Sequence, residues 1–169
     1  MDDKVRTGGC QCGAVRYRAD APLSNAHICH CRMCQKAAGN YFLPLGSVEV
    51  DNFHVTRGEV SWFFSSDIVR RGFCSRCGTP MIYDPIGSGH IAIALGSLDR
   101  PQDVVPEWQS DTEMAMPFFA ALSGLRANLG EGDATREDQA RYETIRLSSH
   151  QHPDHDTAEW PNSRGSDHD

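Results

Sequence analysis

The sequence lacks any apolar run near the roughly 20 residues that a membrane-spanning helix needs. It also lacks an excess of positive charge, because 16 Lys and Arg stand against 23 Asp and Glu and give a net charge of -7. Surfaces that bind nucleic acid are basic. The first residues, Met1-Asp2-Asp3-Lys4, are acidic where a secretory signal peptide would be basic and then apolar. These absences predict a cytoplasmic protein that binds neither membrane nor nucleic acid.

The C-terminal stretch lacks apolar residues. From Ser148 to Asp169 it carries five acidic residues against one arginine, a net charge of -4 that leaves -3 for the rest of the chain. His, Asp, Ser and Pro dominate this stretch, and Trp160 is almost its only apolar anchor. We therefore expect residues 148–169 to form a disordered acidic and His-rich tail. Its histidines could bind a metal loosely, although a solvated tail is favoured: His150, His152, His155 and His168.

What is present instead is cysteine, in three groups. Three thiols within six residues cannot pair with one another without severe strain, and clustered cysteines in a reducing compartment more often bind metal or carry out chemistry than form disulfides. The groups are Cys10 with Cys12; Cys29, Cys31 and Cys34; and Cys74 with Cys77.

The seven cysteines divide as four plus three. A structural zinc site has four protein ligands, whereas a catalytic site has three and an open position. The sequence favours one site that joins the first pair to the last pair and a second site on the central three. A single four-thiolate site with unligated core thiols is an alternative. A purely redox role for Cys31 and Cys34 is less favoured, because that spacing normally opens a long helix after a buried parallel strand.

The charge of the three-cysteine site limits its chemistry. Three thiolates on a divalent ion give a net charge of -1, which weakens the ion's activation of water. An open position of this kind suits a soft donor such as a thiolate. We therefore expect a small-molecule thiol substrate rather than a hydrolytic one.

Short polar-apolar alternations indicate strands. Residues 14–19 alternate, and further short strands are expected between 41 and 73, at 81–84 and at 90–96, separated by polar turns, which is typical of antiparallel β structure. A short helix is predicted after Cys31 and ended by Gly39. Helix is also expected at 118–129 and from Thr135, as N-cap, to about Leu147.

Three motifs, taken together, resemble the glutathione-dependent formaldehyde-activating family, relatives of centromere protein V. They are Gly9-Cys10-x-Cys12-Gly13, Cys29-His30-Cys31-x-x-Cys34-Gln35-Lys36-x-x-Gly39 and Phe73-Cys74-x-x-Cys77-Gly78-Thr79-Pro80, and they span roughly Thr7 to Leu98.

The resemblance implies a mainly β fold, a β-tent of short antiparallel sheets with zinc knuckles. It implies two zinc ions per chain: a structural one on Cys10, Cys12, Cys74 and Cys77, and a catalytic one on Cys29, Cys31 and Cys34. The preference for zinc over iron rests on ligand type and on the resemblance, because four-thiolate sites accept both. The implied activity is condensation of formaldehyde with glutathione, a carbon-sulfur lyase reaction run in reverse.

The resemblance weakens beyond Leu98. Typical members carry a histidine-containing strand and a tryptophan-rich segment there, where this chain has Pro106-Glu107-Trp108-Gln109-Ser110 and Met114-Ala115-Met116-Pro117-Phe118. The alternative to an enzyme is therefore a non-catalytic, zinc-stabilised binding or scaffold module in which both metals are structural.

Other polar residues carry weaker expectations. His30 is a candidate proton donor by proximity, with a surface or supporting role favoured, and Arg32 and Lys36 could meet a substrate carboxylate or be solvated. Three histidines are expected to be structural: His27, His54 and His90. Arg70 and Arg71, with Arg6, Arg16 and Arg18, could form an anion site, but a solvated strand face is favoured.

The length and composition suit one domain with a hydrophobic core. We expect a zinc-binding domain over residues 1–130, a C-terminal helix over 131–147 and the tail over 148–169.

Overall fold

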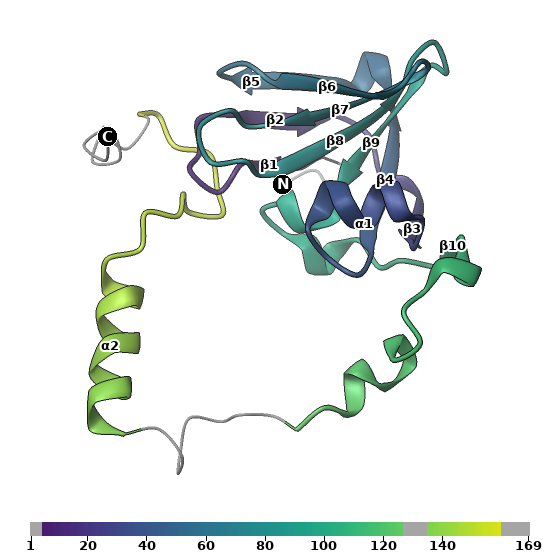
Figure 1. Ribbon diagram of the computed structural model, residues 1–169. Coiled ribbons are helices and arrows are strands. Elements are labelled where there is room, and N and C mark those ends of the chain that lie inside the picture. Colours follow the sequence, from purple (N-terminus) through teal and green to yellow (C-terminus); the bar gives the residue numbers. More distant parts are fainter. Residues whose placement is uncertain (1–4, 127–134, 160–169) are drawn as a thin grey trace.

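The computed structural model describes residues 5–126 and 135–159 of the chain. Strands in this part form two sheets (Figure 1). The smaller sheet has the order β1 (Arg6–Gly9), β2 (Arg16–Ala19), β5 (Phe53–Arg57). The larger has the order β10 (Trp108–Ser110), β3 (Ser24–Cys29), β4 (Leu43–Glu49), β9 (His90–Ala94), β8 (Pro80–Pro85), β7 (Val69–Phe73), β6 (Ser61–Ser66). The prediction of a mainly β fold of short sheets is confirmed.

The strand pairings are antiparallel except at one edge. There β10 runs parallel to β3, with Trp108 opposite His27 and Ser110 opposite Cys29. The sequence did not predict β10, because a three-residue strand leaves almost no alternation to detect. The parallel edge brings the segment after residue 110 next to the end of β3.

Helix α1 (Arg32–Ala38) follows Cys31, as predicted. The Cys31 side chain caps its N-terminus by accepting a hydrogen bond from the Cys34 N–H. Gly39 ends it with a φ of +58°, a left-handed conformation that glycine adopts without a steric penalty. These two ends fix Cys31 and Cys34 on the first turn of the helix.

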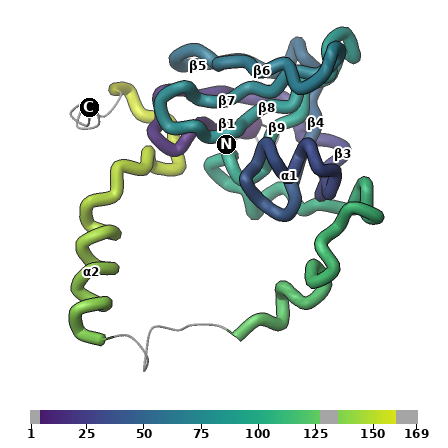
Figure 2. The backbone as a smooth tube through the Cα atoms, in the orientation of Figure 1, coloured from purple at the N-terminus to yellow at the C-terminus, as the bar shows by residue number. Residues whose placement is uncertain are grey.

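Helix α2 (Arg136–Leu147) is also as predicted. Thr135 and Asp138 form a reciprocal capping box at its start. None of its residues is buried, and Figure 2 shows the helix standing apart from the sheets. The helix expected over 118–129 is instead a 3-10 helix, Phe119–Gly124, and residues 127–129 lie outside the described residues.

The core consists of two clusters of buried side chains. The first joins side chains from both sheets and includes the fully buried Tyr17, Met81 and Ile93. The second lies at α1 and combines Cys29 and Cys34 with residues of β4 and β9. Cysteines of both predicted sites thus belong to the core, which rigidly positions their sulfur atoms.

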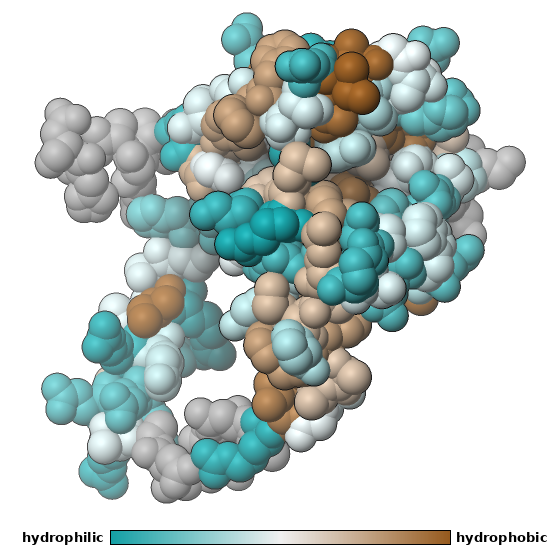
Figure 3. Space-filling model, turned by 45° about the vertical axis from the view of Figure 1, so that its right-hand side comes forward, coloured by the Kyte–Doolittle hydropathy of each residue, from teal (hydrophilic) through white to brown (hydrophobic). Residues whose placement is uncertain are grey.

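The segment after β10 exposes several apolar side chains to solvent. Met114, Phe118 and Leu125 are among its exposed apolar side chains, and apolar surface follows this segment in Figure 3. Among the described residues, no helix is both long and apolar enough to cross a membrane.

Candidate metal centres

The four-cysteine centre joins two turns that are far apart in the sequence. Cys10 and Cys12 follow β1, and Cys74 and Cys77 lie between β7 and β8. The four sulfur atoms lie within 4.8 Å of one another. Cys12 Sγ is 3.7 Å from Cys10 Sγ and 3.8 Å from Cys74 Sγ. Thiolates held about 2.3 Å from a tetrahedral zinc would lie about 3.8 Å apart, so these thiols fit that ion.

Local hydrogen bonds shape both turns of this centre. The Gly78 N–H donates to the Cys74 carbonyl at 2.8 Å, with Gly78 at a φ of +75°. The Val15 N–H donates to Cys10 Sγ at 3.2 Å. Burial raises the pKa of Cys10. Burial also acts to raise the pKa of Cys77, but hydrogen bonds with Thr79 and Cys12 together outweigh it, and the pKa is lowered to about 6. Cys77 therefore has the thiolate character that a metal ligand needs.

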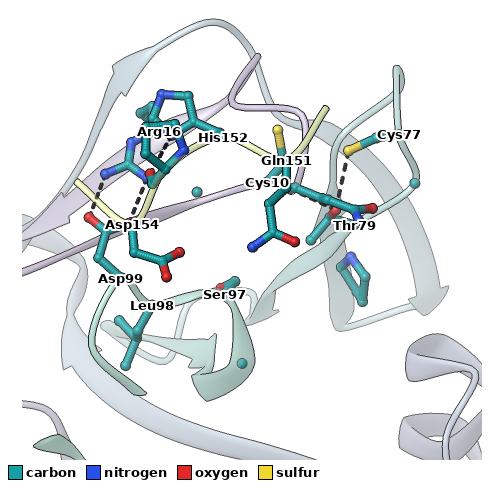
Figure 4. A pocket seen from close by; sticks show the side chains of 16 residues that line it. Cys10, Arg16, Cys77, Thr79, Ser97, Leu98, Asp99, Gln151, His152 and Asp154 are labelled. Atoms are coloured by element: carbon teal, nitrogen blue, oxygen red, sulfur yellow. Dashed lines mark hydrogen bonds and ion pairs between the residues drawn. The ribbon is translucent and has the colours of Figure 1, made fainter. Parts of the chain in front are cut away.

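A C-terminal strap, residues 149–159, lies against the four-cysteine centre (Figure 4). The His152 N–H donates to the Gln11 carbonyl at 2.8 Å, and His152 is 4% exposed. Arg16, 3% exposed, pairs with Asp99 at 2.5 Å and with Asp156 of the strap at 2.8 Å. The strap has no helix or strand, as expected of the tail, but it is bound to the β structure rather than merely solvated. Residues 160–169 lie outside the described residues.

The three-cysteine centre lies where β3 meets α1. Cys29 ends β3, Cys31 caps α1 and Cys34 lies in its first turn. Their sulfur atoms lie within 4.8 Å of one another. All seven cysteines of the chain are free thiols, and α1 has only seven residues, so the long helix of a redox motif is absent here. The three sulfur atoms could therefore act as soft ligands of one metal ion, and zinc accepts such ligands.

Two charged side chains contact this centre from other elements. Arg71 Nη2 of β7 donates to Cys34 Sγ at 3.5 Å. The Cys29 thiol donates to Asp111 Oδ2 at 3.4 Å. Burial raises the pKa of Cys34 to about 12, with Arg71 acting in the opposite direction, and burial also raises the pKa of Cys29. These thiols need a nearby cation to become thiolates.

A cavity of about 640 Å³ opens beside the three cysteines. All three line it, together with side chains of the larger sheet and of the segment after β10. Its volume lies within the range of about 300–1,000 Å³ that is usual for small-molecule sites. Its other polar lining residues include His27, Arg71, Tyr83, His90, Ser110 and Asp111.

The other sequence candidates fall in different places. His30 is fully buried, its Nε2 is hydrogen-bonded to Gln109 Oε1 at 2.8 Å, and it does not line the cavity. Arg32 and Lys36 do not line it either, whereas His27 and His90, expected to be structural, do. His54 pairs with Asp20 at 3.2 Å, a structural role as expected.

Sequence reasoning missed three cavity residues. Arg71 was grouped with Arg70 on a solvated face, although neighbouring strand residues point to opposite faces. Tyr83 gave no signal beyond its strand. Asp111 follows β10 with a φ of +53°, and its position depends on a parallel pairing that no local pattern indicated. The segment at 106–110 contributes Ser110 to the wall. Its Trp108 stacks on the lining residue His27, with 4.5 Å between ring centroids.

Comparison with known proteins shows that a protein family and a curated protein match this sequence. The profile of a family described as "Glutathione-dependent formaldehyde-activating enzyme" matches residues 5–113, more than half of the chain. A Halomonas elongata protein named "Putative glutathione-dependent formaldehyde-activating enzyme" is 34% identical over 88 residues, 46% of this chain and 55% of that protein. The chain thus spans about half the length of this curated relative.

A solved structure is also similar. A crystal structure of a Rhodobacter sphaeroides protein has a TM-score of 0.49 and 20% identity, covering 62% of this chain and 99% of that one.

Proposed function

Because the chain belongs to the glutathione-dependent formaldehyde-activating enzyme family, we propose that it condenses a thiol of the glutathione type with formaldehyde or a related small electrophile. The observation that carries this proposal is the group of three buried or half-buried thiols at the wall of a 640 Å³ cavity. We propose Cys29, Cys31 and Cys34 as ligands of a catalytic zinc. Cys10, Cys12, Cys74 and Cys77 would hold a structural zinc.

The proposed reaction is an addition that needs neither an oxidant nor a reductant. The substrate sulfur forms a bond to the carbonyl carbon, the carbon-oxygen π electrons move to oxygen, and that oxygen takes up the proton that the thiol has lost. When bound, zinc would favour the thiolate form of the substrate. The chain supplies the cavity that positions the two reactants, which is a large part of the rate advantage of a two-substrate enzyme.

The cavity also contains groups that can exchange a proton with the new hydroxyl. Tyr83, His27 and His90 line it. His30, the candidate by proximity in sequence, is directed to Gln109 instead. Proton donation from a lining group or from water in the cavity is therefore favoured over donation from His30. The free thiols agree with the reducing cytoplasm proposed as its location.

The test is formaldehyde-glutathione exchange measured by NMR on the zinc-loaded protein, with Cys31→Ser as the comparison. We expect exchange faster than the spontaneous reaction in the wild-type protein and loss of this acceleration in Cys31→Ser. One zinc per chain should remain in the variant, showing that the four-cysteine centre and the fold are retained. Equal rates for wild type and variant would rule out catalysis at the three cysteines.

One observation bears on the rival function, a non-catalytic module with two structural metals. Asp111 contacts Cys29 and could act as a fourth ligand that closes the second centre. However, its carboxylate is not among the ligand atoms that lie within 4.8 Å of one another, which favours an open position. Absorption of the cobalt-substituted protein distinguishes the enzyme from the module. A spectral change when a thiol is added to wild type supports the enzyme. A spectrum that does not change with thiol in wild type, but does change in Asp111→Ala, supports the module.

A further inference from the structure

Arg71 is a buried arginine beside the three-cysteine centre. Its residue is 7% exposed. Its guanidinium donates to Cys34 Sγ at 3.5 Å and lies over the Tyr83 ring, 5.0 Å from the centroid. Its Nε is buried without a hydrogen-bond partner. Within the described ranges, 5–126 and 135–159, no ion pair joins Arg71 to an acidic side chain.

The neighbouring arginine has a different environment. Arg70 Nε pairs with Asp84 Oδ2 at 2.6 Å, and its guanidinium stacks over Trp62 at 4.0 Å. Its side chain is 38% exposed. The two residues are adjacent in β7, so their side chains lie on opposite faces of the sheet. The charge of Arg70 is therefore paired on the face away from the cysteines, and the Arg71 side chain is directed toward them.

A buried guanidinium remains charged, because arginine is not deprotonated in proteins. Such a charge is costly unless an anion accompanies it. Among the contacts of Arg71, Cys34 Sγ is the atom that can carry negative charge. Three thiolates around a divalent ion sum to -1, and the guanidinium brings this sum to zero.

We propose that Arg71 is the counter-cation of the three-cysteine centre: its buried guanidinium, hydrogen-bonded to Cys34 Sγ, keeps the loaded centre neutral, so that a substrate thiolate can bind there. It acts through Cys34 and is thus a positioning residue. The inference rests on the proposed metal at this centre but requires no turnover. With Arg71 included, the net charge of the loaded centre is zero, instead of the -1 of a divalent ion with three thiolates.

The opposing interpretation is that Arg71 anchors a carboxylate of the substrate. The geometry favours the counter-cation, because the polar contact that the guanidinium makes is to a ligand sulfur and Nε is enclosed. A carboxylate anchor would affect only thiols that carry a carboxylate. A counter-cation would affect every thiol to a similar extent.

The experiment uses the cobalt-loaded full chain as wild type, Arg71→Met, Arg71→Lys and the control Arg70→Met. Absorption is recorded first without thiol and then during titration with 2-mercaptoethanol or with 3-mercaptopropionate. Only an open centre should respond to added thiol. The four-cysteine centre reports in every sample whether the fold is retained, because it should keep its own cobalt.

Two results are expected. Without thiol, the sulfur-to-cobalt charge-transfer bands of Arg71→Met shift to longer wavelength, because Cys34 sulfur loses a hydrogen bond that stabilises its lone pairs. With thiol, Arg71→Met binds both probes about 10- to 100-fold more weakly, the equivalent of a hydrogen bond to a charged group. Arg71→Lys restores part of both effects, and Arg70→Met behaves as wild type.

Charge-transfer bands that do not shift in Arg71→Met would overturn the proposal. Weaker binding of 3-mercaptopropionate alone would also overturn it, because that result would assign Arg71 as a carboxylate anchor. If Arg71→Met fails to retain cobalt at the four-cysteine centre, Arg71→Lys decides by the same criteria. Failure of the proposed function would look different: wild-type protein would show the bands of the centre but no acceleration of formaldehyde exchange.

Discussion

Asp99 connects the β structure with the C-terminal strap through one arginine. Its carboxylate accepts hydrogen bonds from Arg16 at 2.5 and 2.8 Å and from Thr7 Oγ1 at 2.6 Å. Arg16 in turn binds Asp156. Burial acts to raise the pKa of Asp99, but the hydrogen bonds from Arg16 and Thr7 and the charge of Arg16 outweigh it, so the pKa lies below its ordinary value.

We predict that Asp99→Asn lowers the free energy of unfolding at pH 7 by about 3 kcal/mol. This value is at the lower end of the roughly 3–5 kcal/mol lost when one partner of a buried ion pair is removed. Because the pKa of Asp99 is depressed in the folded state, its contribution is fully present above the unfolded-state value of about 4 and is lost as pH falls through the folded-state value. Urea unfolding of wild type and variant at several pH values measures the difference.

The matched control is Asp103→Asn, which removes a surface pair with Arg100. Such a pair contributes less than about 1 kcal/mol. Equal free energies of unfolding for wild type and Asp99→Asn at pH 7 would show that the buried ion pair does not contribute to stability.

At the level of single residues, the sequence predicted the two cysteine groups that could hold a metal, but not the residues around them. The cysteine groupings follow from spacing, because a metal ligand set leaves a local pattern. Arg71, Tyr83 and Asp111 reach the same cavity from β7, β8 and the segment after β10. Such proximity depends on strand order and register, and nothing in the residues' own neighbourhoods encodes it. The position of His30 in the sequence, between two of these cysteines, likewise does not reveal the direction of its ring, which faces Gln109.

At the level of elements, capping chemistry was the reliable signal. Helix α1 begins and ends at residues whose side chain or φ angle fixes the boundary, Cys31 and Gly39, and α2 begins at the capping side chain of Thr135. The strap was expected to be disordered because its composition offers little apolar area to bury. It is held instead by long-range hydrogen bonds and ion pairs, which composition does not reveal.

We predict that ending the chain after Ser149 weakens the four-cysteine centre. The truncation removes His152 from the Gln11 carbonyl and Asp156 from the buried Arg16. We expect the midpoint of thermal unfolding to fall by about 4–8 °C, which corresponds to about 2 kcal/mol, because 1 kcal/mol shifts the midpoint by about 2–4 °C in a chain of this size. Zinc should also leave the four-cysteine centre faster in the presence of a chelator.

A chain ended after Glu159 is the control, because it keeps both of these contacts. Asp156→Asn in the full chain should reproduce part of the loss. Identical melting of the Ser149 truncation and the Glu159 control would mean that the strap contacts do not contribute to stability.

For the whole molecule, the four-cysteine centre is the junction between the two sheets. Cys10 and Cys12 follow a strand of the smaller sheet, and Cys74 and Cys77 connect two strands of the larger one. Cys10 and Cys74 also belong to the core cluster that contains side chains of both sheets. The three-cysteine centre differs, because its ligands come from one continuous stretch of chain, β3 and α1.

The two centres should therefore respond differently to metal removal. A structural zinc contributes roughly 10 kcal/mol to folding, which is comparable to the 5–15 kcal/mol total stability typical of a domain. We predict that Cys74→Ser, or complete removal of metal from wild type, abolishes cooperative unfolding, whereas Cys31→Ser retains it with a reduced metal content of one per chain. Near-ultraviolet circular dichroism during thermal melting, with metal counted by mass spectrometry under native conditions, distinguishes these states.

The reason for the asymmetry is topological. Loss of the ligand from Cys74 separates turns more than sixty residues apart in sequence, so the entropy of closing that long loop is no longer offset by metal bonds. Loss of the ligand from Cys31 frees only a short segment whose strand and helix have their own hydrogen bonds. Cooperative melting of metal-free wild type would contradict this account, because the sheets would then be joined by their apolar core alone.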